Sequence, residues 1–166
     1  MKNIVATLSL LFATTLSAQV AIGKATVSSP AVSLEFYDNA DNTRGIILPW
    51  VTSTAAVTGA VNGTIVYNTA DRKVYVKYAS GWRDLSVDNT GTVTTTLQDS
   101  LTDQDTAKVL IGGDPATDTT PGILVLADTN KAMVLPKVAS PHLNIVNPSP
   151  GMMVYDTTKK QLAVFN

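Results

Sequence analysis

The sequence contains no cysteine, so no disulfide, no thiolate metal ligand and no cysteine-linked lipid is available to this chain. His142 is its single histidine, which disfavours a zinc site and a serine–histidine nucleophile pair. No paired-acid pattern for glycoside hydrolysis stands out among the turn-forming aspartates. We therefore expect no enzyme activity, no cofactor and no metal, and stability that comes from packing, strand pairing or assembly.

The chain also lacks an excess of charge of either sign, since it has 12 basic and 13 acidic residues. A nucleic-acid binder would show a basic excess, so no nucleic-acid partner is expected. Aspartate and asparagine cluster at residues 38–42 and 99–105, but neither cluster has the spacing of a calcium loop, and both residue types are common in turns. Structural calcium stays an alternative to plain turn chemistry at these two places.

Long apolar runs are absent except at the N-terminus, where Lys2 precedes an apolar stretch from Ile4 to Phe12. Small residues follow, with a cleavage point after Ala18 or Gln19. This order is typical of a secretory signal peptide, and the apolar stretch is shorter than the ~20 residues that span a bilayer. We predict a signal peptide over residues 1–18, export to the periplasm, cell surface or medium, and no membrane span after its removal.

One phrase occurs twice: "GTIVYNTADRKVYV" begins at Gly63, and "GMMVYDTTKKQLAV" begins at Gly151. Each copy is preceded by a Leu-Pro pair, and the lead-in "IG…P" also occurs twice. Agreement at this many spaced positions indicates a structural duplication. The repeated motif positions are Leu48, Pro49, Gly63, Tyr67 and Asn68 in the first copy, and Leu135, Pro136, Gly151, Tyr155 and Asp156 in the second.

Apolar residues alternate with polar ones on both sides of a turn in each copy, which predicts a β-hairpin. Few helix-forming surfaces exist, and Glu35 is the single glutamate. We predict an all-β chain of two tandem β-hairpin modules, stacked or intertwined and fibre-like. The predicted boundaries are a first module at 19–86, a Thr/Asp-rich linker or extended strand at 87–106, and a second module at 107–166 whose last hairpin is incomplete.

Each module has about 55 to 60 residues, and a unit of this size buries too little apolar surface to be comfortably stable alone. The two modules are therefore expected to pack on each other or on modules of other chains. An incomplete terminal hairpin would also leave an unpaired edge that can accept another strand. Both considerations favour self-assembly as a trimer or a filament.

The order "G-h-h-L-P", a polar loop, "G-h-h-V-Y-[ND]-T", a turn and a late "G-W" resembles a repeat module of exported Bacteroidota proteins and of tail-fibre-like shafts (h is an apolar residue). The first copy carries the whole pattern through Gly81 and Trp82, whereas the second stops before a counterpart of that pair. Trp50 and Lys137 stand where the module commonly has arginine. The resemblance implies a β-rich, fibre-like surface structure and little mechanism.

Two further sets of residues are candidate sites. Trp50, Trp82 and Tyr75 could form a face for a glycan or another surface protein, although strand aromatics more often cover a sheet. Exported Bacteroidota proteins are often O-glycosylated at Asp-[Ser/Thr] followed by an apolar residue or Thr, and this pattern occurs four times. Asp-Ser and Asp-Thr are also common in turns. The candidate O-glycosylation residues are Ser100, Thr106, Thr119 and Thr157.

Two functions remain open at this point. The first is a non-catalytic secreted structural protein that forms a homo-oligomeric surface fibre or filament, with itself as partner. The alternative is a cell-surface adhesion or glycan-binding module that uses exposed aromatics.

Overall fold

The computed structural model describes residues 19–96, 98–102, 104 and 106–165, and the signal peptide expected at 1–18 lies outside them. The described chain is nearly all β, which confirms the predicted fold class. Its strands are β1 (Val20–Ile22), β2 (Val32–Phe36), β3 (Ile46–Ile47), β4 (Trp50–Val51), β5 (Ile65–Asn68), β6 (Lys73–Tyr78), β7 (Gly81–Asp84), β8 (Val109–Ile111), β9 (Leu124–Leu126), β10 (Ala132–Val134), β11 (Lys137–Val138), β12 (Met152–Asp156) and β13 (Gln161–Val164).

The repeated phrase forms the same hairpin twice, β5–β6 in the first copy and β12–β13 in the second. Alternating apolar residues put one side of each hairpin toward the core, as period-two patterns do. Arg72 and Lys160 hold matching places in the two turns, and both have a positive φ, of 63° and 55°. The duplication seen in the sequence is therefore also a duplication of backbone conformation.

Proline divides the segment before each hairpin into two short strands, because it cannot donate to a sheet ladder. The strand after the proline pairs in parallel with its own hairpin: β4 with β5, and β11 with β12. The strand before the proline, β3 or β10, leaves its own hairpin and pairs with the other copy. Each Leu-Pro pair thus directs one segment into two different sheets.

The lead-in segments are also alike, since β1 pairs in parallel with β2, and β8 pairs in parallel with β9. Their registers correspond: Val20 lies opposite Leu34, and Val109 lies opposite Leu124. Leu34 and Leu124 are therefore counterparts, as are the residues that follow each of them. Both copies have the order of a parallel pair, a strand before proline, a strand after proline and a hairpin.

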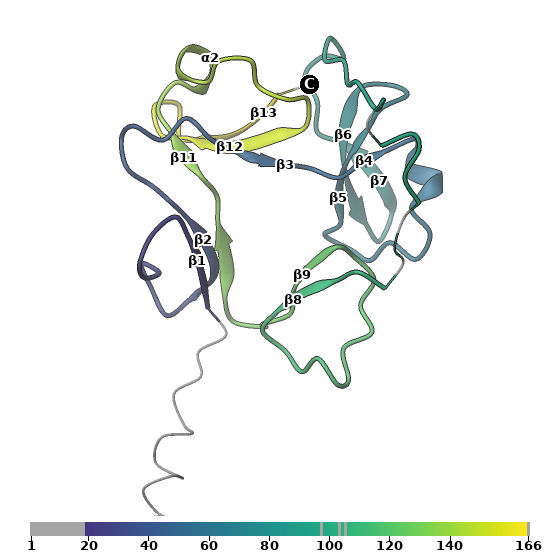
Figure 1. Cartoon of the computed structure of the whole chain (residues 1–166), viewed down its shortest axis with the longest axis horizontal. Coiled ribbons are helices and arrows are strands. Elements are labelled where there is room, and N and C mark those ends of the chain that lie inside the picture. Colours follow the sequence, from purple (N-terminus) through teal and green to yellow (C-terminus); the bar gives the residue numbers. More distant parts are fainter. Residues whose placement is uncertain (1–18, 97, 103, 105, 166) are drawn as a thin grey trace, which may run out of the picture.

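The two copies interlock through exchanged strands. β10 of the second copy pairs in parallel with β2 of the first, and β3 of the first pairs antiparallel with β12 of the second. Figure 1 shows the result: β1, β2 and β10 lie on the left, β3 and β11–β13 at the top, β4–β7 on the right, and β8–β9 at the bottom. Each copy therefore contains a sheet that is completed by a strand of the other copy.

The main core cluster lies where the two hairpins meet. Leu48, Tyr67 and Val74 of the first copy pack with Met153 of the second, and all four are buried. Half-buried apolar residues of both copies, including Met133 and those of the two hairpins, surround them. A second cluster of Val138, Ile145 and Val154 lies on the other side of the β12–β13 hairpin.

Helical structure in the described chain is limited to two short turns, the 3-10 helix η1 (Thr54–Ala56) and the α-helix α2 (Pro141–Asn144). Each lies between the strand that follows the motif proline and the hairpin of the same copy. No helix in the described part of the chain is long and apolar enough to cross a membrane. Between the copies, the described residues of 87–106 form turns and irregular backbone without a strand.

Candidate assembly surfaces and an aromatic face

The motif proline of each copy has no backbone N–H to donate, but its carbonyl oxygen accepts a hydrogen bond. The Pro49 carbonyl oxygen accepts the N–H of Tyr67 at 2.9 Å, and the Pro136 carbonyl oxygen accepts the N–H of Tyr155 at 2.9 Å. In both copies the motif proline is therefore tied to the motif tyrosine by one backbone bond. The Leu-Pro and Val-Tyr motifs belong together because their backbones meet in space.

The residue after each tyrosine, Asn68 or Asp156, is buried and closes the hairpin turn. Asn68 accepts one backbone N–H from two residues further along the chain, at 3.0 Å. Asp156 accepts three, from Thr158 at 2.8 Å, Lys159 at 3.1 Å and Ser140 at 3.3 Å. Burial of Asp156 opposes its ionisation, but these three donors outweigh it and hold the pKa of Asp156 below its ordinary value.

The glycine that begins each hairpin, Gly63 or Gly151, has a positive φ, of 91° and 77°. At Gly151 the absence of a side chain also matters, because a Cβ there would lie 3.1 Å from Cβ of Tyr67. The second copy's glycine is therefore part of the contact between the two hairpins.

Trp50 also serves that contact. Its indole Nε1 donates to the Pro150 carbonyl oxygen at 2.9 Å, and its ring packs against the main core cluster. Trp50 lies opposite Tyr67 in the β4–β5 pairing, so it is on the sheet face that carries Tyr67. The structure thus places this aromatic residue at the junction of the copies.

Tyr75 and Trp82 lie on the opposite face of the β4–β7 sheet from Trp50. On that face Trp82 is opposite Lys77 in the β6–β7 ladder, with the Lys77 Nζ 6.0 Å from the ring centroid. The Tyr75 hydroxyl donates to Asp71 Oδ2 at 2.6 Å, and this bond, aided by burial, raises the pKa of Tyr75 to about 12. The structure brings two of the three candidate aromatics together and separates the third.

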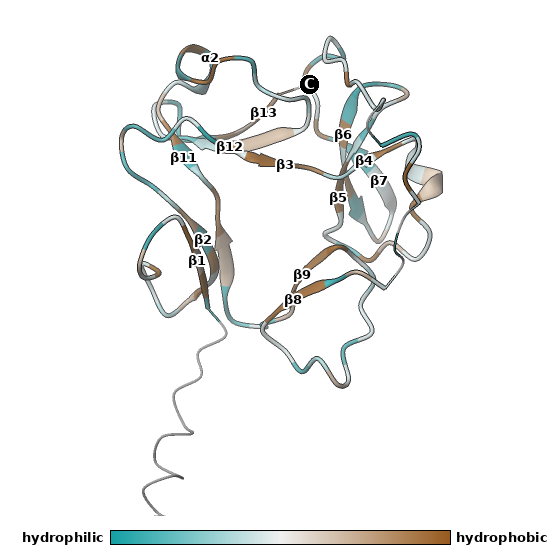
Figure 2. Cartoon of the chain, in the orientation of Figure 1, coloured by the Kyte–Doolittle hydropathy of each residue, from teal (hydrophilic) through white to brown (hydrophobic). Residues whose placement is uncertain are grey.

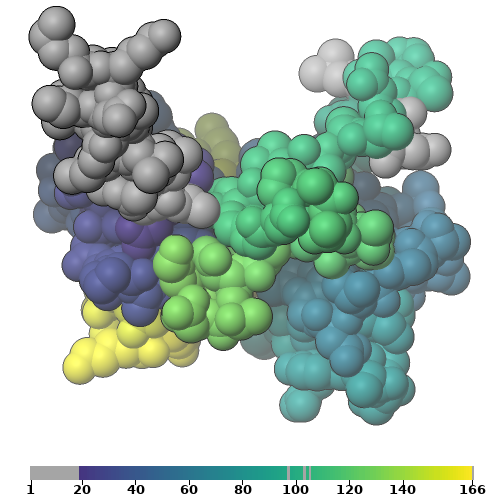
Figure 3. All heavy atoms as spheres, turned by 90° about the horizontal axis from the view of Figure 1, so that it is seen from below, coloured from purple at the N-terminus to yellow at the C-terminus, as the bar shows by residue number. Residues whose placement is uncertain are grey.

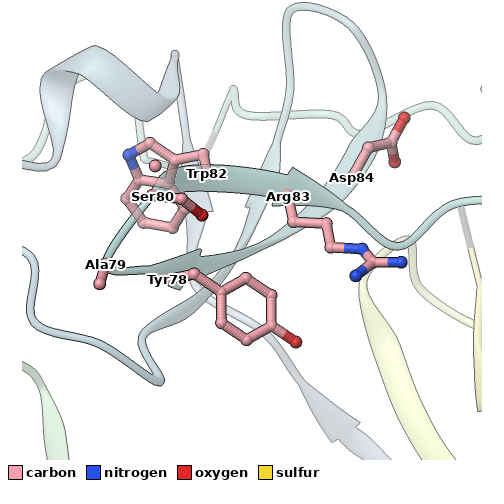
Figure 4. A pocket seen from close by; sticks show the side chains of 7 residues that line it. Tyr78, Ala79, Ser80, Trp82, Arg83 and Asp84 are labelled. Carbon is pink, nitrogen blue, oxygen red and sulfur yellow. The ribbon is translucent and has the colours of Figure 1, made fainter.

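A shallow pocket at the tip of the β6–β7 hairpin lies beside this aromatic face. Its lining runs from Tyr78 to Asp84, and Figure 4 shows Tyr78 and Trp82 on different sides of the hairpin, with the Arg83 guanidinium on the side of Tyr78. The tip therefore offers aromatic and cationic groups to solvent. Tyr78 and Arg83 adjoin the "G-W" pair in the sequence, and neither belongs to the predicted set of Trp50, Trp82 and Tyr75.

An ion-pair network around the buried Glu35 joins the copies at β2, where no site was predicted from the sequence. Glu35 is fully buried, and its Oε1 lies 2.9 Å from Lys24 Nζ, which also lies 3.2 Å from Asp38. Burial opposes ionisation of Glu35, yet the bond from Lys24 and a backbone N–H keep its pKa below the ordinary value. Lys137 of the second copy reaches Asp38 at 3.4 Å. The one sequence feature that could have indicated this network is Glu35, the single glutamate, placed within a β-strand.

The four candidate O-glycosylation residues are all exposed. Ser100 and Thr106 lie between the copies, whereas Thr119 precedes β9 and Thr157 follows β12. Among the described residues, no group of three or more His, Asp or Glu side chains is arranged to hold a metal ion. Glycosylation, and the expected absence of a metal, both stay predictions.

One comparison with known families relates part of this chain to an assembly element. Residues 114–166, which include β9 to β13, match the model of the phage tail like trimerisation region. No curated protein and no solved structure matches the chain. The match covers the second copy from the loop after β8 to its hairpin and supports self-association of the chain, whereas the first copy lies outside it.

Proposed function

We propose that this protein is a non-catalytic structural subunit that is exported and assembles as a homotrimer within a surface fibre. The observation that carries the proposal is the match of residues 114–166 to a trimerisation region. Export rests on the signal-like residues 1–18, and the fibre-like character rests on the all-β repeat architecture. A closed trimer forms when two different surfaces of one chain meet head-to-tail between neighbours and the rotation closes after three chains.

The fold supports assembly because neither copy is self-sufficient. The first copy buries its hairpin with help from Met153 of the second copy, and its β2 needs β10 of the second copy as a neighbour. Units that depend on the next unit in this way are typical of repeat proteins, whose stability accumulates across unit interfaces. A trimer continues the same dependence between chains.

Light scattering coupled to size-exclusion chromatography tests this function on the chain that begins at Gln19. The expected result is a particle of three chains that dissociates into single chains only on strong dilution. A single-chain mass at every concentration would contradict the proposal. Electron microscopy of the same peak then checks whether the trimers are elongated.

A binding function is the second candidate, and the shared face of Tyr75 and Trp82 favours it. Aromatic rings beside the cationic Lys77 form a surface on which a sugar ring can stack. We propose this face as a secondary glycan or surface-protein site on the fibre. A glycan array should lose its signal with Trp82→Ala, while Thr69→Ala, which does not touch that face, should keep it; equal signals from both variants would exclude the site.

The exposed hydroxyl residues of the four Asp-[Ser/Thr] motifs support a separate proposal about modification. We propose that Ser100, Thr106, Thr119 and Thr157 are O-glycosylated in the exporting organism, since all four are accessible. The intact mass of protein from its native host should exceed that of the unmodified mature chain. An unmodified mass would exclude the modification.

A further inference from the structure

The lead-in sheets of the two copies differ in one strand. β2 lies between β1 and β10, whereas no described strand pairs with β9 on the side away from β8. Side-chain exposure differs accordingly: Leu34 on β2 is 1% exposed, and its counterpart Leu124 on β9 is 46% exposed. Figure 2 shows β8 and β9 as apolar, and Figure 3 shows the green segment that contains them at the surface.

The open edge of β9 has backbone groups aimed outward. Val109 donates to the Ile123 carbonyl, and Ala127 donates to the Ile111 carbonyl, so residues 123, 125 and 127 face β8. Successive residues of a strand direct their N–H and C=O groups to opposite edges. Leu124 and Leu126 therefore present theirs to the open edge, where the counterparts on β2 meet β10. An apolar, unpaired edge of this kind is a template for another strand.

The second hairpin is open at matching positions as well. In the first copy the cross-strand pair Tyr67 and Val74 is 0% and 1% exposed. In the second copy the corresponding pair, Tyr155 and Leu162, is 36% and 45% exposed. The surfaces that the first copy buries against the second are thus exposed on the second copy itself.

The chain also carries a strand with a suitable free edge. The counterpart of β10 is β3, which pairs with β12 through one edge: Leu48 donates to the Gly151 carbonyl at 3.0 Å. The backbone groups of Ile47 therefore point to the other edge, and its side chain is 50% exposed. In β10 the counterpart of Ile47 is Val134, whose side of the strand is the one that pairs with β2.

We infer that β3 of a second copy of this chain adds to the open edge of β9 in parallel. The pairing within the chain sets the register, since Met133 lies opposite Leu34 and Val134 lies opposite Glu35. Transferred to the counterparts, Ile46 lies opposite Leu124 and Ile47 lies opposite Val125. The inference rests on the proposed trimer, and the region that matches the trimerisation family contains β9.

This contact is head-to-tail, because the second repeat of one chain receives the first repeat of the next. Head-to-tail contacts form a closed ring when their rotation closes, and three chains about a threefold axis complete such a ring. Each chain then gives one β3 and receives one, so the trimer leaves no β9 edge unpaired. Main-chain hydrogen bonds would supply affinity, and the apolar side chains of the two strands would supply the buried area.

Engineered cysteines test the contact directly, since the natural chain has none to interfere. Full-length mature Ile47→Cys protein is mixed with Val125→Cys protein, unfolded, refolded together and oxidised with copper phenanthroline. A covalent dimer on a non-reducing gel is expected from the mixture and from neither variant alone. The double variant Ile47→Cys/Val125→Cys should give a covalent trimer. Val87→Cys, at a 99% exposed position outside any strand, is the matched control for random collisions.

The outcomes separate this inference from the function on which it rests. A trimer by light scattering without the Ile47–Val125 cross-link would overturn the β3–β9 contact and leave the trimeric function standing. A monomer by light scattering would overturn both. Cross-linking of Val87→Cys to the same extent would also overturn the contact, because exposure alone would then explain it. Circular dichroism of each variant checks that the cysteines leave the fold intact.

Discussion

The strands β2 and β9 hold the same place in the two copies and have different surroundings. Both are short strands that pair in parallel with a lead-in strand, and their registers correspond. One is buried because β10 lies beside it, and the other is half exposed because its neighbour is missing from the described chain. The comparison shows that burial in this fold depends on the next repeat, more than on the strand's own sequence.

The largest expected effects come from replacing Leu34 of β2 and its counterpart Leu124 of β9 with alanine, because the two variants should fail in different ways. Leu34→Ala removes a fully buried side chain and should lower the free energy of unfolding by about 2–5 kcal/mol, whatever the protein concentration. Leu124→Ala should mainly weaken the trimer and shift its dissociation to higher concentrations. Urea unfolding at several concentrations, with light scattering alongside, measures both effects. Equal, concentration-independent losses from the two variants would contradict the account.

The two copies can also be compared at the start of the segments that precede the prolines, where the first copy has Gly45 and the second has Ala132. A Cβ on Gly45 would lie 2.6 Å from Met152 Cγ, 2.7 Å from Val154 Cγ1 and 2.9 Å from the Met153 carbonyl oxygen. Gly45→Ala should therefore destabilise the chain by about 1–3 kcal/mol, since a backbone atom cannot easily give way. Thermal unfolding checks the value.

The control is the counterpart position, where the second copy already has Ala132, which is exposed. Ala132→Gly should cost only about 0.5–1 kcal/mol, from the added freedom of glycine in a strand. A larger loss at Ala132 than at Gly45 would mean that β3 does not lie close to β12.

The buried turn residues give the smallest expected effect, which depends on pH. The pKa of Asp156 is lower in the folded chain than its ordinary value, so its contribution to stability is present above about pH 4 and is lost as the pH falls through the folded pKa. Asp156→Asn, which copies Asn68 of the first repeat, should be less stable than the natural chain at neutral pH. The gap should narrow toward pH 2.

Melting temperatures of both proteins between pH 7 and pH 2 provide the measurement. Asn68→Asp is the reverse exchange and should leave the stability at neutral pH nearly unchanged or lower, because Asn68 accepts a single backbone bond at its turn. A gap between natural chain and Asp156→Asn that widens in acid would contradict the assigned role of the carboxylate.

Much of each repeat was predictable because its signals are local. Alternating residues around Tyr67 and Tyr155 predict the hairpins. Pro49 and Pro136 predict that the strand segment before each hairpin is interrupted. The hairpins predicted from the repeated phrase lie at β5–β6 and β12–β13 in the structure. Turn chemistry and period-two patterns act over a few residues, so a single sequence contains them.

The contacts between copies were not predictable in the same way. Nothing in the sequences around Leu34 and Leu124 tells that one acquires a third strand and the other does not. Trp50 was expected with Tyr75 and Trp82, but the register of β4 against β5 puts it on the other face. Such outcomes depend on which strand, far along the chain, arrives at a given edge.

The most direct test of the account is hydrogen exchange at the amides of Leu124 and Leu126 in the assembled protein, measured against the amide of Leu34. If β3 of a neighbouring chain covers β9, the two β9 amides should be protected in the trimer to a degree near that of Leu34, and should lose this protection when the trimer is diluted into monomers. Fast exchange of Leu124 and Leu126 in a trimer whose Leu34 amide stays protected would contradict the claim that the second repeat is completed by another chain.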